Sequence, residues 1–149
     1  MSEVQAKSTE FLTELFGNMR FDLSVSAEKT DEGYLFDLKG KDAPFLLNES
    51  GEMLDALETI LFQIYGKEIE RTERFICDAD GFRQTRRAEL QAMARFAANH
   101  VRKNGKPFTF GKLNGTERRV IHLTLQTETD LDTESVGEGR ERRLQVRLK

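Results

Sequence analysis

Apolar residues in the first third of the chain change from helical spacing to strict alternation. Helical spacing joins Phe11, Leu12, Leu15, Phe16 and Met19. With Gly17 as a stop signal, this run predicts a short amphipathic helix. Alternation with polar residues follows at Phe21, Leu23 and Val25 and again at Tyr34, Phe36 and Leu38. The turn-rich residues 29–33 separate the two alternating runs, so we expect a β-hairpin with one buried face.

A short apolar patch at residues 45–47 and a long helical stripe flank the turn Asn48-Glu49-Ser50-Gly51. The stripe consists of Met53, Leu54, Leu57, Ile60, Leu61 and Ile64. This arrangement predicts two helices joined by a turn. Residues 70–78 then predict a strand. The expected order over residues 8–79 is therefore helix, strand, strand, helix, helix, strand.

The second half of the chain begins with the longest expected helix. Its apolar face consists of Phe82, Leu90, Met93, Ala94, Ala97 and Val101. Asn104-Gly105 should end this helix, residues 107–110 predict a short strand, and Asn114 with Glu117 predicts a capping box for a last helix. Residues 133–148 predict a hairpin that turns at residues 137–139. We expect an α+β protein with domains over residues 1–79 and 80–149.

Composition limits the compartment and the covalent chemistry. No apolar run among the 149 residues approaches the roughly 18 residues that a membrane-spanning helix needs. The first residues, MSEVQAKSTEF, lack the basic start and apolar core of a signal peptide, so we expect a cytoplasmic protein without membrane insertion. Cys77 is the only cysteine, which excludes a disulfide within the chain, and it is expected to be buried in a strand.

The formal net charge of −3 conceals an asymmetry between the two halves. Residues 1–80 contain 18 Asp and Glu against 8 Lys and Arg, a net charge of −10. Residues 81–149 contain 8 against 15, a net charge of +7. The second half therefore provides the positive field that attracts phosphate groups. Chance clustering of solvated surface charge is the alternative explanation.

The motifs of both halves resemble domains that bind nucleic acids. The element order over residues 8–79 resembles a type II KH domain. The segment Glu117-Arg118-Arg119-Val120-Ile121-His122-Leu123, followed by residues 133–139 and Arg142-Arg143, is similar to the R-3-H domain, named for an Arg and a His separated by three residues. A KH domain followed by an R-3-H domain resembles the Jag family of bacterial, SpoIIIJ-associated RNA-binding proteins. This resemblance implies a non-catalytic protein that binds single-stranded nucleic acid, RNA by preference, as an RNA-binding regulator or an RNA chaperone.

Arg118 and His122 are the central candidate residues for nucleic-acid binding. Residues four apart lie on one face of a helix, so these two side chains should project together while Val120, Ile121 and Leu125 turn toward the core. Arginine offers a planar, permanently charged group for phosphate or for base stacking, and histidine can donate a hydrogen bond and stack its ring. An ordinary polar helix surface is the alternative.

Other arginines are expected to support this pair. A hairpin packed beside the last helix would place its basic strand along the same surface. The supporting residues would then be Arg119, Arg140, Arg142 and Arg143. Weaker candidates on the long helix are Arg83, Arg86 and Arg87. Basic residues on an exposed helix usually serve solubility, so solvated charge without a ligand is the alternative for each of them.

The turn of the KH-like domain departs from the pattern of that family. The family has Gly-x-x-Gly with basic middle residues, whereas this chain has Asn48-Glu49-Ser50-Gly51. Only the second glycine is retained, and Glu49 repels phosphate. We therefore expect this domain to bind RNA weakly. It would instead serve as a scaffold that packs on its neighbour, on another KH protein or on a second copy of this chain.

Two other classes of function compete with RNA binding. Enzymatic activity has little support, because His100 and His122 lie outside the HExxH, CxxC and GxSxG motifs. Asp78 and Asp80 fit strand-end and helix-capping roles better than metal ligation. We therefore expect no catalytic residue, cofactor or metal. The second class is a protein-interaction adaptor that uses the acidic half for partner binding or dimerisation. The expected nucleic acid is single-stranded RNA, with single-stranded DNA as a second candidate.

Overall fold

The computed structural model describes residues 1–149 and divides into two units with separate hydrophobic cores. The N-terminal unit comprises Met1–Arg83 and the C-terminal unit comprises Gln84–Lys149. Each unit combines helices with one three-stranded sheet, which confirms the expected α+β class. No helix combines the length and the apolar composition that crossing a bilayer requires.

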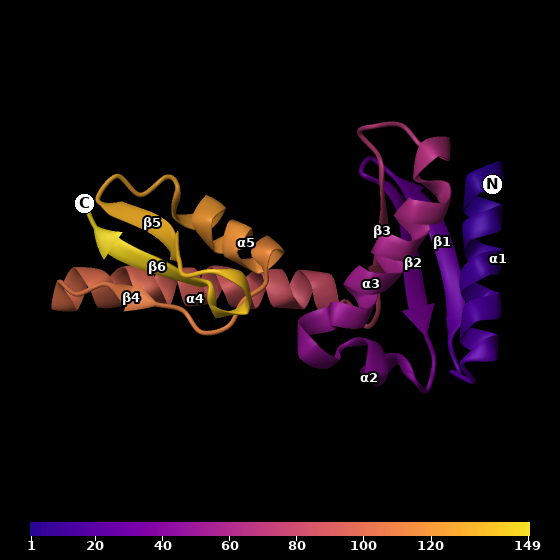
Figure 1. Ribbon diagram of the computed structural model, residues 1–149, viewed down its shortest axis with the longest axis horizontal. Helices are drawn as coiled ribbons and strands as arrows, with labels where there is room; N and C mark the ends of the chain where they lie inside the picture. Colours follow the sequence, from indigo (N-terminus) through magenta and orange to yellow (C-terminus); the bar gives the residue numbers. More distant parts are fainter. The chain divides into compact units, whose positions relative to one another are not determined.

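The N-terminal unit contains a mixed sheet covered by helices (Figure 1). Its elements are α1 (Glu3–Asn18), β1 (Ser24–Thr30), β2 (Gly33–Lys39), α2 (Ala43–Leu46), α3 (Asn48–Tyr65), the 3-10 turn η1 (Gly66–Glu68) and β3 (Arg74–Asp78). The strand order is β1-β2-β3, with β1 antiparallel and β3 parallel to β2. This is the element order that the sequence pattern predicted.

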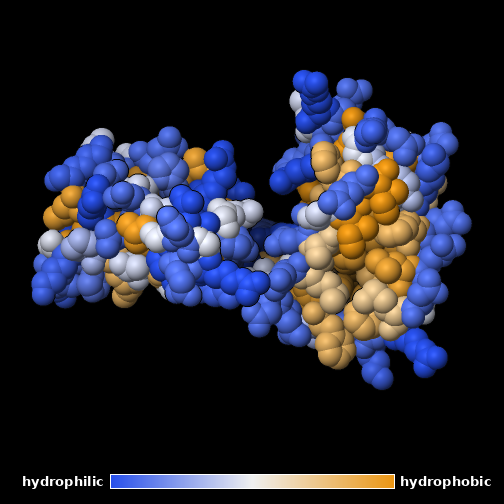
Figure 2. All heavy atoms as spheres, in the orientation of Figure 1, coloured by the Kyte–Doolittle hydropathy of each residue, from blue (hydrophilic) through white to orange (hydrophobic).

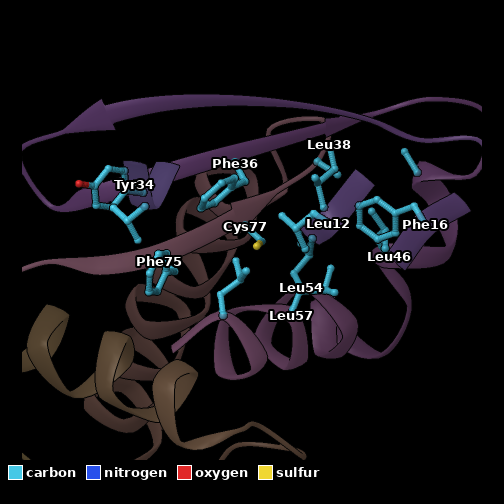
Figure 3. Packing of buried hydrophobic residues seen from close by; sticks show 14 residues of the cluster. Leu12, Phe16, Tyr34, Phe36, Leu38, Leu46, Leu54, Leu57, Phe75 and Cys77 are labelled. Atoms are coloured by element: carbon cyan, nitrogen blue, oxygen red, sulfur yellow. The ribbon is translucent and has the colours of Figure 1, made fainter. Parts of the chain in front are cut away.

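The helices α1 and α3 bury their apolar stripes against this sheet (Figure 3). The innermost side chains are Leu12, Phe16, Phe36, Leu38 and Leu54, each at most 1% exposed. Cys77 on β3 is fully buried in the same cluster, as expected, and burial raises the pKa of its thiol. Packing in the apolar core therefore accounts for Cys77, and no reactive role is needed to explain its presence.

The helix α1 begins earlier than its apolar spacing predicted. Ser2 caps it by accepting a hydrogen bond from the backbone N–H of Gln5 at 3.2 Å. Ser8 is fully buried and donates its hydroxyl to the carbonyl of Val4 at 2.6 Å, so a polar residue occupies the core face. Polar interactions stabilise this first part of the helix, so the spacing of apolar residues does not predict it.

Two strands begin later than the alternation predicted. The strand β1 begins at Ser24, because the N–H of Phe21 donates to the carbonyl of Phe16 at 2.9 Å and closes the end of α1. Arg20 lies in the left-handed region there, with φ 59°. The strand β3 begins at Arg74, after a turn in which the N–H of Glu73 donates to Glu70. Local turns therefore replace the first residues of both predicted strands.

The turn at the beginning of α3 has left-handed backbone at three consecutive residues. Glu49, Ser50 and Gly51 have φ of 53°, 57° and 77°. Each of the two non-glycine residues costs about 1–2 kcal/mol in this region. A side chain at Gly51 is excluded, because its Cβ would lie 2.6 Å from Cε1 of Phe82. Packing of Phe82 therefore requires the glycine that this turn retains.

The C-terminal unit packs two helices on an antiparallel sheet (Figure 1). Its elements are α4 (Phe82–Asn104, of which the first two residues belong to the N-terminal unit), β4 (Phe108–Thr109), α5 (Gly115–Leu125), β5 (Leu131–Val136), the 3-10 turn η2 (Gly139–Glu141) and β6 (Arg143–Leu148). The strand order is β4-β6-β5. Ala94 and Ala97 of α4, Ile121 of α5 and Val146 of β6 are fully buried at the centre.

Most of this unit agrees with the sequence pattern. The helix α4 ends at Asn104 and the short strand β4 lies within residues 107–110, as predicted. The final hairpin is present, with Thr133 opposite Val146. Its connection is longer than the predicted turn, because η2 extends it over residues 137–142.

We expect Gly51→Ala to lower the free energy of unfolding of the N-terminal unit by about 1–3 kcal/mol. Alanine is strained at this φ and its methyl group displaces the Phe82 ring. Gly17→Ala is the matched control, because Gly17 lies in α1 with nothing within 4 Å of the added Cβ. This second change should raise stability by about 0.5–1 kcal/mol. Urea unfolding measures both, and equal effects would contradict the packing role of Gly51.

Candidate nucleic-acid interface

A capping box fixes the first turn of α5, which carries the candidate pair. The side chain of Asn114 accepts a hydrogen bond from the N–H of Glu117 at 2.8 Å, and Glu117 Oε1 accepts from the N–H of Asn114 at 3.2 Å. The sequence pattern predicted this box, and the structure confirms it. Ile121 is fully buried, which sets the rotation of the helix. Arg118 and His122 consequently lie on a face that reaches the surface.

Arg118 is half-buried beside the start of α5. Its Nη1 donates to the carbonyl of Leu113 at 2.8 Å, and its Nη2 lies close to Gly115. The guanidinium group therefore folds back toward the N-terminal end of its own helix, the usual direction for a helical side chain. It forms no ion pair with an acidic residue, so its other N–H groups remain available to an anion or a base.

His122 is exposed and is oriented by the sheet. Its Nδ1 forms a hydrogen bond with the hydroxyl of Thr133 on β5. The other ring nitrogen has no partner within the chain. No hydrogen bond joins His122 to Arg118, so the helix presents two groups that are each oriented by a separate partner.

Three of the four supporting arginines are free of acidic partners. Arg119 on α5 is exposed, and Arg140 and Arg142 are exposed in the connection between β5 and β6. Arg143 has a different role. Its Nη1 donates to the carbonyls of Arg140 at 2.8 Å and Arg142 at 3.1 Å, so it shapes the loop that carries the other two.

The expected alignment of the basic strand with the face of α5 is wrong. Leu144 and Val146 of β6 point into the core, so Arg143 and Arg147 lie on the opposite face of the sheet. Arg147 is there paired with Asp132 at 3.3 Å. The loop before β6, rather than the strand itself, therefore carries the free positive charge.

Two arginines of α4 serve the fold of the C-terminal unit. Arg86 donates from Nε to Glu117 at 2.6 Å, and the Glu117 residue is only 6% exposed. Arg102 pairs with Glu128 at 2.8 Å and with Asp130 at 2.7 Å. The hydrogen bond from Arg102 lowers the pKa of the Asp130 carboxyl. Arg87, by contrast, is exposed and unpaired.

The candidate residues of the N-terminal unit offer no cationic site. Glu49 is exposed in the turn at residues 48–51, which contains no basic residue. Arg83 pairs with Asp55 and Glu58, both at 2.8 Å. Asp78 ends β3, as expected, and its side chain accepts a hydrogen bond from the N–H of Arg83 at 3.1 Å. No group of three or more potential metal-ligating side chains is brought together anywhere in the chain.

An aromatic cluster on the C-terminal unit was missed by the sequence pattern. Phe96 and His100 of α4 lie beside Phe108 of β4 and Phe110, with neighbouring ring centroids 5.1–6.2 Å apart. One signal was available: Phe96 lies outside the apolar stripe of α4 and has the same four-residue spacing to a histidine as the candidate pair on α5.

Comparison with known proteins identifies two kinds of similarity. Residues 88–148 match the family model of the R-3-H domain, and this range includes every candidate binding residue on α5 and in the final hairpin. The chain is 30% identical over 148 residues to an RNA-binding protein KhpB of Clostridium symbiosum, covering 98% of this chain and 67% of that protein. It is 27% identical over 124 residues to the RNA-binding protein KhpB of Bacillus subtilis (strain 168), covering 82% and 60%. The chain thus spans about two thirds or less of these relatives.

We expect Glu117→Ala to destabilise the C-terminal unit by about 2–4 kcal/mol. The change removes half of the capping box and leaves the Arg86 guanidinium without its buried partner. Glu117→Gln is the control, because glutamine still accepts from Asn114 but loses the charge, and it should cost about half as much. Amide hydrogen exchange along α5 in the full chain measures the effect. Unchanged exchange in Glu117→Ala would show that α5 is held by other contacts.

Proposed function

This chain belongs to the Jag family of RNA-binding proteins, and from this premise we propose that it binds single-stranded RNA mainly through its C-terminal unit. Single-stranded DNA is a second ligand with the same chemistry. The observation that carries the proposal is the placement of Arg118 and His122 on one helix within the matched R-3-H range, neither paired with an acidic residue. The role is binding without catalysis, as a cytoplasmic RNA-binding regulator or RNA chaperone.

The proposed contacts follow from the orientation of each side chain. Arg118 lies near the N-terminal end of α5, where the helix dipole also favours a phosphate. His122 offers its free ring nitrogen and its ring face to a base. Arg119, with Arg140 and Arg142 from the loop, adds cations for the backbone of the bound strand.

The N-terminal unit has a supporting role in this proposal. Two relatives named as RNA-binding proteins favour RNA binding over the alternative of a protein-interaction adaptor. Within an RNA-binding protein, the N-terminal unit would be a KH-like scaffold that packs on another KH protein or on a second copy of the chain. Apolar residues gathered on one face of this unit support this role (Figure 2). The exposed apolar residues of the unit include Phe45 of α2 and Ile60 and Ile64 of α3.

Replacing Arg118 and His122 together by alanine tests the central claim. Arg118→Ala alone should weaken binding of a single-stranded oligoribonucleotide by about 1–3 kcal/mol, because a charge-assisted contact or a stacking partner is lost. The double variant should weaken it further. Fluorescence anisotropy at several salt concentrations measures both the affinity and the salt slope, which falls by about 0.7 for each phosphate contact that is removed.

The control for this experiment is Arg87→Ala, which removes an exposed and unpaired arginine from α4. This change should cause only a small loss of affinity for the oligoribonucleotide, and the loss should shrink as the salt concentration rises. Circular dichroism establishes that each variant is folded. Wild-type affinity in the folded double variant would remove the assignment of α5 as the binding helix.

Restoring a cation and a glycine to the turn of the N-terminal unit tests its scaffold role. Asn48→Gly with Glu49→Lys shifts the local charge by two units and frees the backbone. If the turn approaches RNA, each new bond to a phosphate should add on the order of 1 kcal/mol at low salt. We expect no such increase in affinity, because a scaffold surface does not meet the bound strand.

A matched charge change separates specific contact from general attraction. Glu58→Lys is unsuitable, because Glu58 accepts from the N–H of Cys77 at 2.8 Å and pairs with Arg83. Glu14→Lys on α1 is suitable, since Glu14 is exposed and unpaired. If the turn variant increases affinity more than Glu14→Lys does, the N-terminal unit contacts RNA directly.

A further inference from the structure

Phe96, at one end of the aromatic cluster, is unusually exposed for a large apolar residue. The Phe96 residue is 62% exposed, although it lies next to the well-packed core of the C-terminal unit. Its ring meets His100 at 6.2 Å and Phe108 at 5.9 Å between centroids, and Phe108 continues to the buried Phe110 at 5.1 Å. The buried Phe110 anchors one end of the cluster, while most of Phe96 at the other end is exposed to solvent.

Two open hollows meet at Phe96. One, of about 300 Å³, is lined by apolar atoms of Ala92, Met93, Phe96, Phe108 and Phe110. The other, also of about 300 Å³, is lined by Phe96, Asn99, His100, Lys103 and Asn104. Each is of the size that a small planar ring system can enter. Apolar atoms make up most of the surface of both hollows, and the second is also bordered by the ammonium group of Lys103 and the amides of Asn99 and Asn104.

The charge around these hollows favours an anionic ligand. None of their lining residues is acidic. Lys103 is exposed and forms no ion pair, and Lys106 follows it, also exposed and unpaired. Asn104 donates from its side-chain amide toward Nε2 of His100 at 3.2 Å, which holds the imidazole ring beside Phe96 and Phe108. An aromatic surface bordered by lysines and amides has the composition of a site for single-stranded nucleic acid.

This cluster is separate from the candidate pair on α5. The cluster includes β4, whereas His122 is bound to Thr133 on β5, and these two strands are the opposite edges of the sheet. A ligand group at Phe96 therefore occupies a different edge of the C-terminal unit from a group at His122.

We propose that Phe96, His100 and Phe108 form a second stacking site, which binds an unpaired base of single-stranded RNA while Lys103 contacts a phosphate beside it. The inference rests on the proposed function, because it adds a second contact to the same ligand. Stacking on an aromatic ring needs no particular base, so this site contributes affinity without sequence preference.

Substitutions at Phe96 test the proposal in the full chain. Phe96→Ala should weaken binding of an oligouridylate about fivefold or more, Phe96→Leu should weaken it nearly as much, and Phe96→Tyr should retain it, because only tyrosine keeps the aromatic face. Phe62→Ala is the matched control, since Phe62 is 59% exposed in the N-terminal unit. An oligomer with the same phosphates but without bases should bind wild type and Phe96→Ala equally.

A fluorescent reporter adds a direct readout. The chain contains no tryptophan, so Phe96→Trp introduces a single indole at the site and Phe62→Trp introduces one at the control position. Titration with the oligouridylate should quench the indole of the Phe96→Trp variant and leave that of the Phe62→Trp variant unchanged. Equal affinity of wild type and Phe96→Ala for the oligouridylate, with no quenching in Phe96→Trp, overturns the second site.

The two proposals fail in different ways. If the Arg118 and His122 double variant loses affinity while every Phe96 variant binds normally, the binding function holds and the aromatic site does not. If the wild type binds no oligonucleotide, the proposed function itself fails. An exposed aromatic surface would in that case point to a protein ligand.

Discussion

The ion pair between Arg86 and Glu117 fixes the position of the helix that carries Arg118 and His122. Glu117 closes the capping box of α5 with one carboxylate oxygen and holds Arg86 of α4 with the other, at a site almost closed to solvent. Rotating or shifting α5 would separate this pair and leave a charge without compensation, which is costly in a buried place. Because α5 has only 11 residues, the position of its first turn decides where Arg118 and His122 lie. One carboxylate thus connects the packing of two helices to the position of the candidate pair.

The cations of the C-terminal unit fall into two populations, and formal charge does not distinguish them. Arg86, Arg102 and Arg147 are engaged by acidic partners and stabilise the fold. Arg119 of α5 and Arg140 and Arg142 of the loop before β6 are exposed and form no ion pair, and the same holds for Arg87, Lys103 and Lys106. The field available to a phosphate therefore comes from fewer residues than the charge of this half of the chain implies.

The sequence predicted the C-terminal elements well because their boundaries are set by local chemistry. The capping box of Asn114 and Glu117 marks the start of α5, and Asn104-Gly105 marks the end of α4. The polar beginning of α1 and the turns that shorten β1 and β3 depend on backbone hydrogen bonds that apolar spacing does not record. The role of Arg143 could not be predicted, because its contacts are carbonyl groups brought near by the fold of a loop. The aromatic cluster could not be predicted, because only the fold of the unit brings Phe108 of β4 beside Phe96 of α4.

The order of strands in the C-terminal sheet has a consequence for ligand length. With β4 and β5 as the outer strands, groups that bind at both edges act on one RNA only if that strand is long enough to pass from one edge to the other. A short oligomer would engage a single edge and dissociate as a monovalent ligand. A longer one would meet the second edge at a high effective concentration, so its avidity would exceed either separate affinity. The affinity of the unit would then depend on the length of an unpaired stretch of RNA rather than on its sequence.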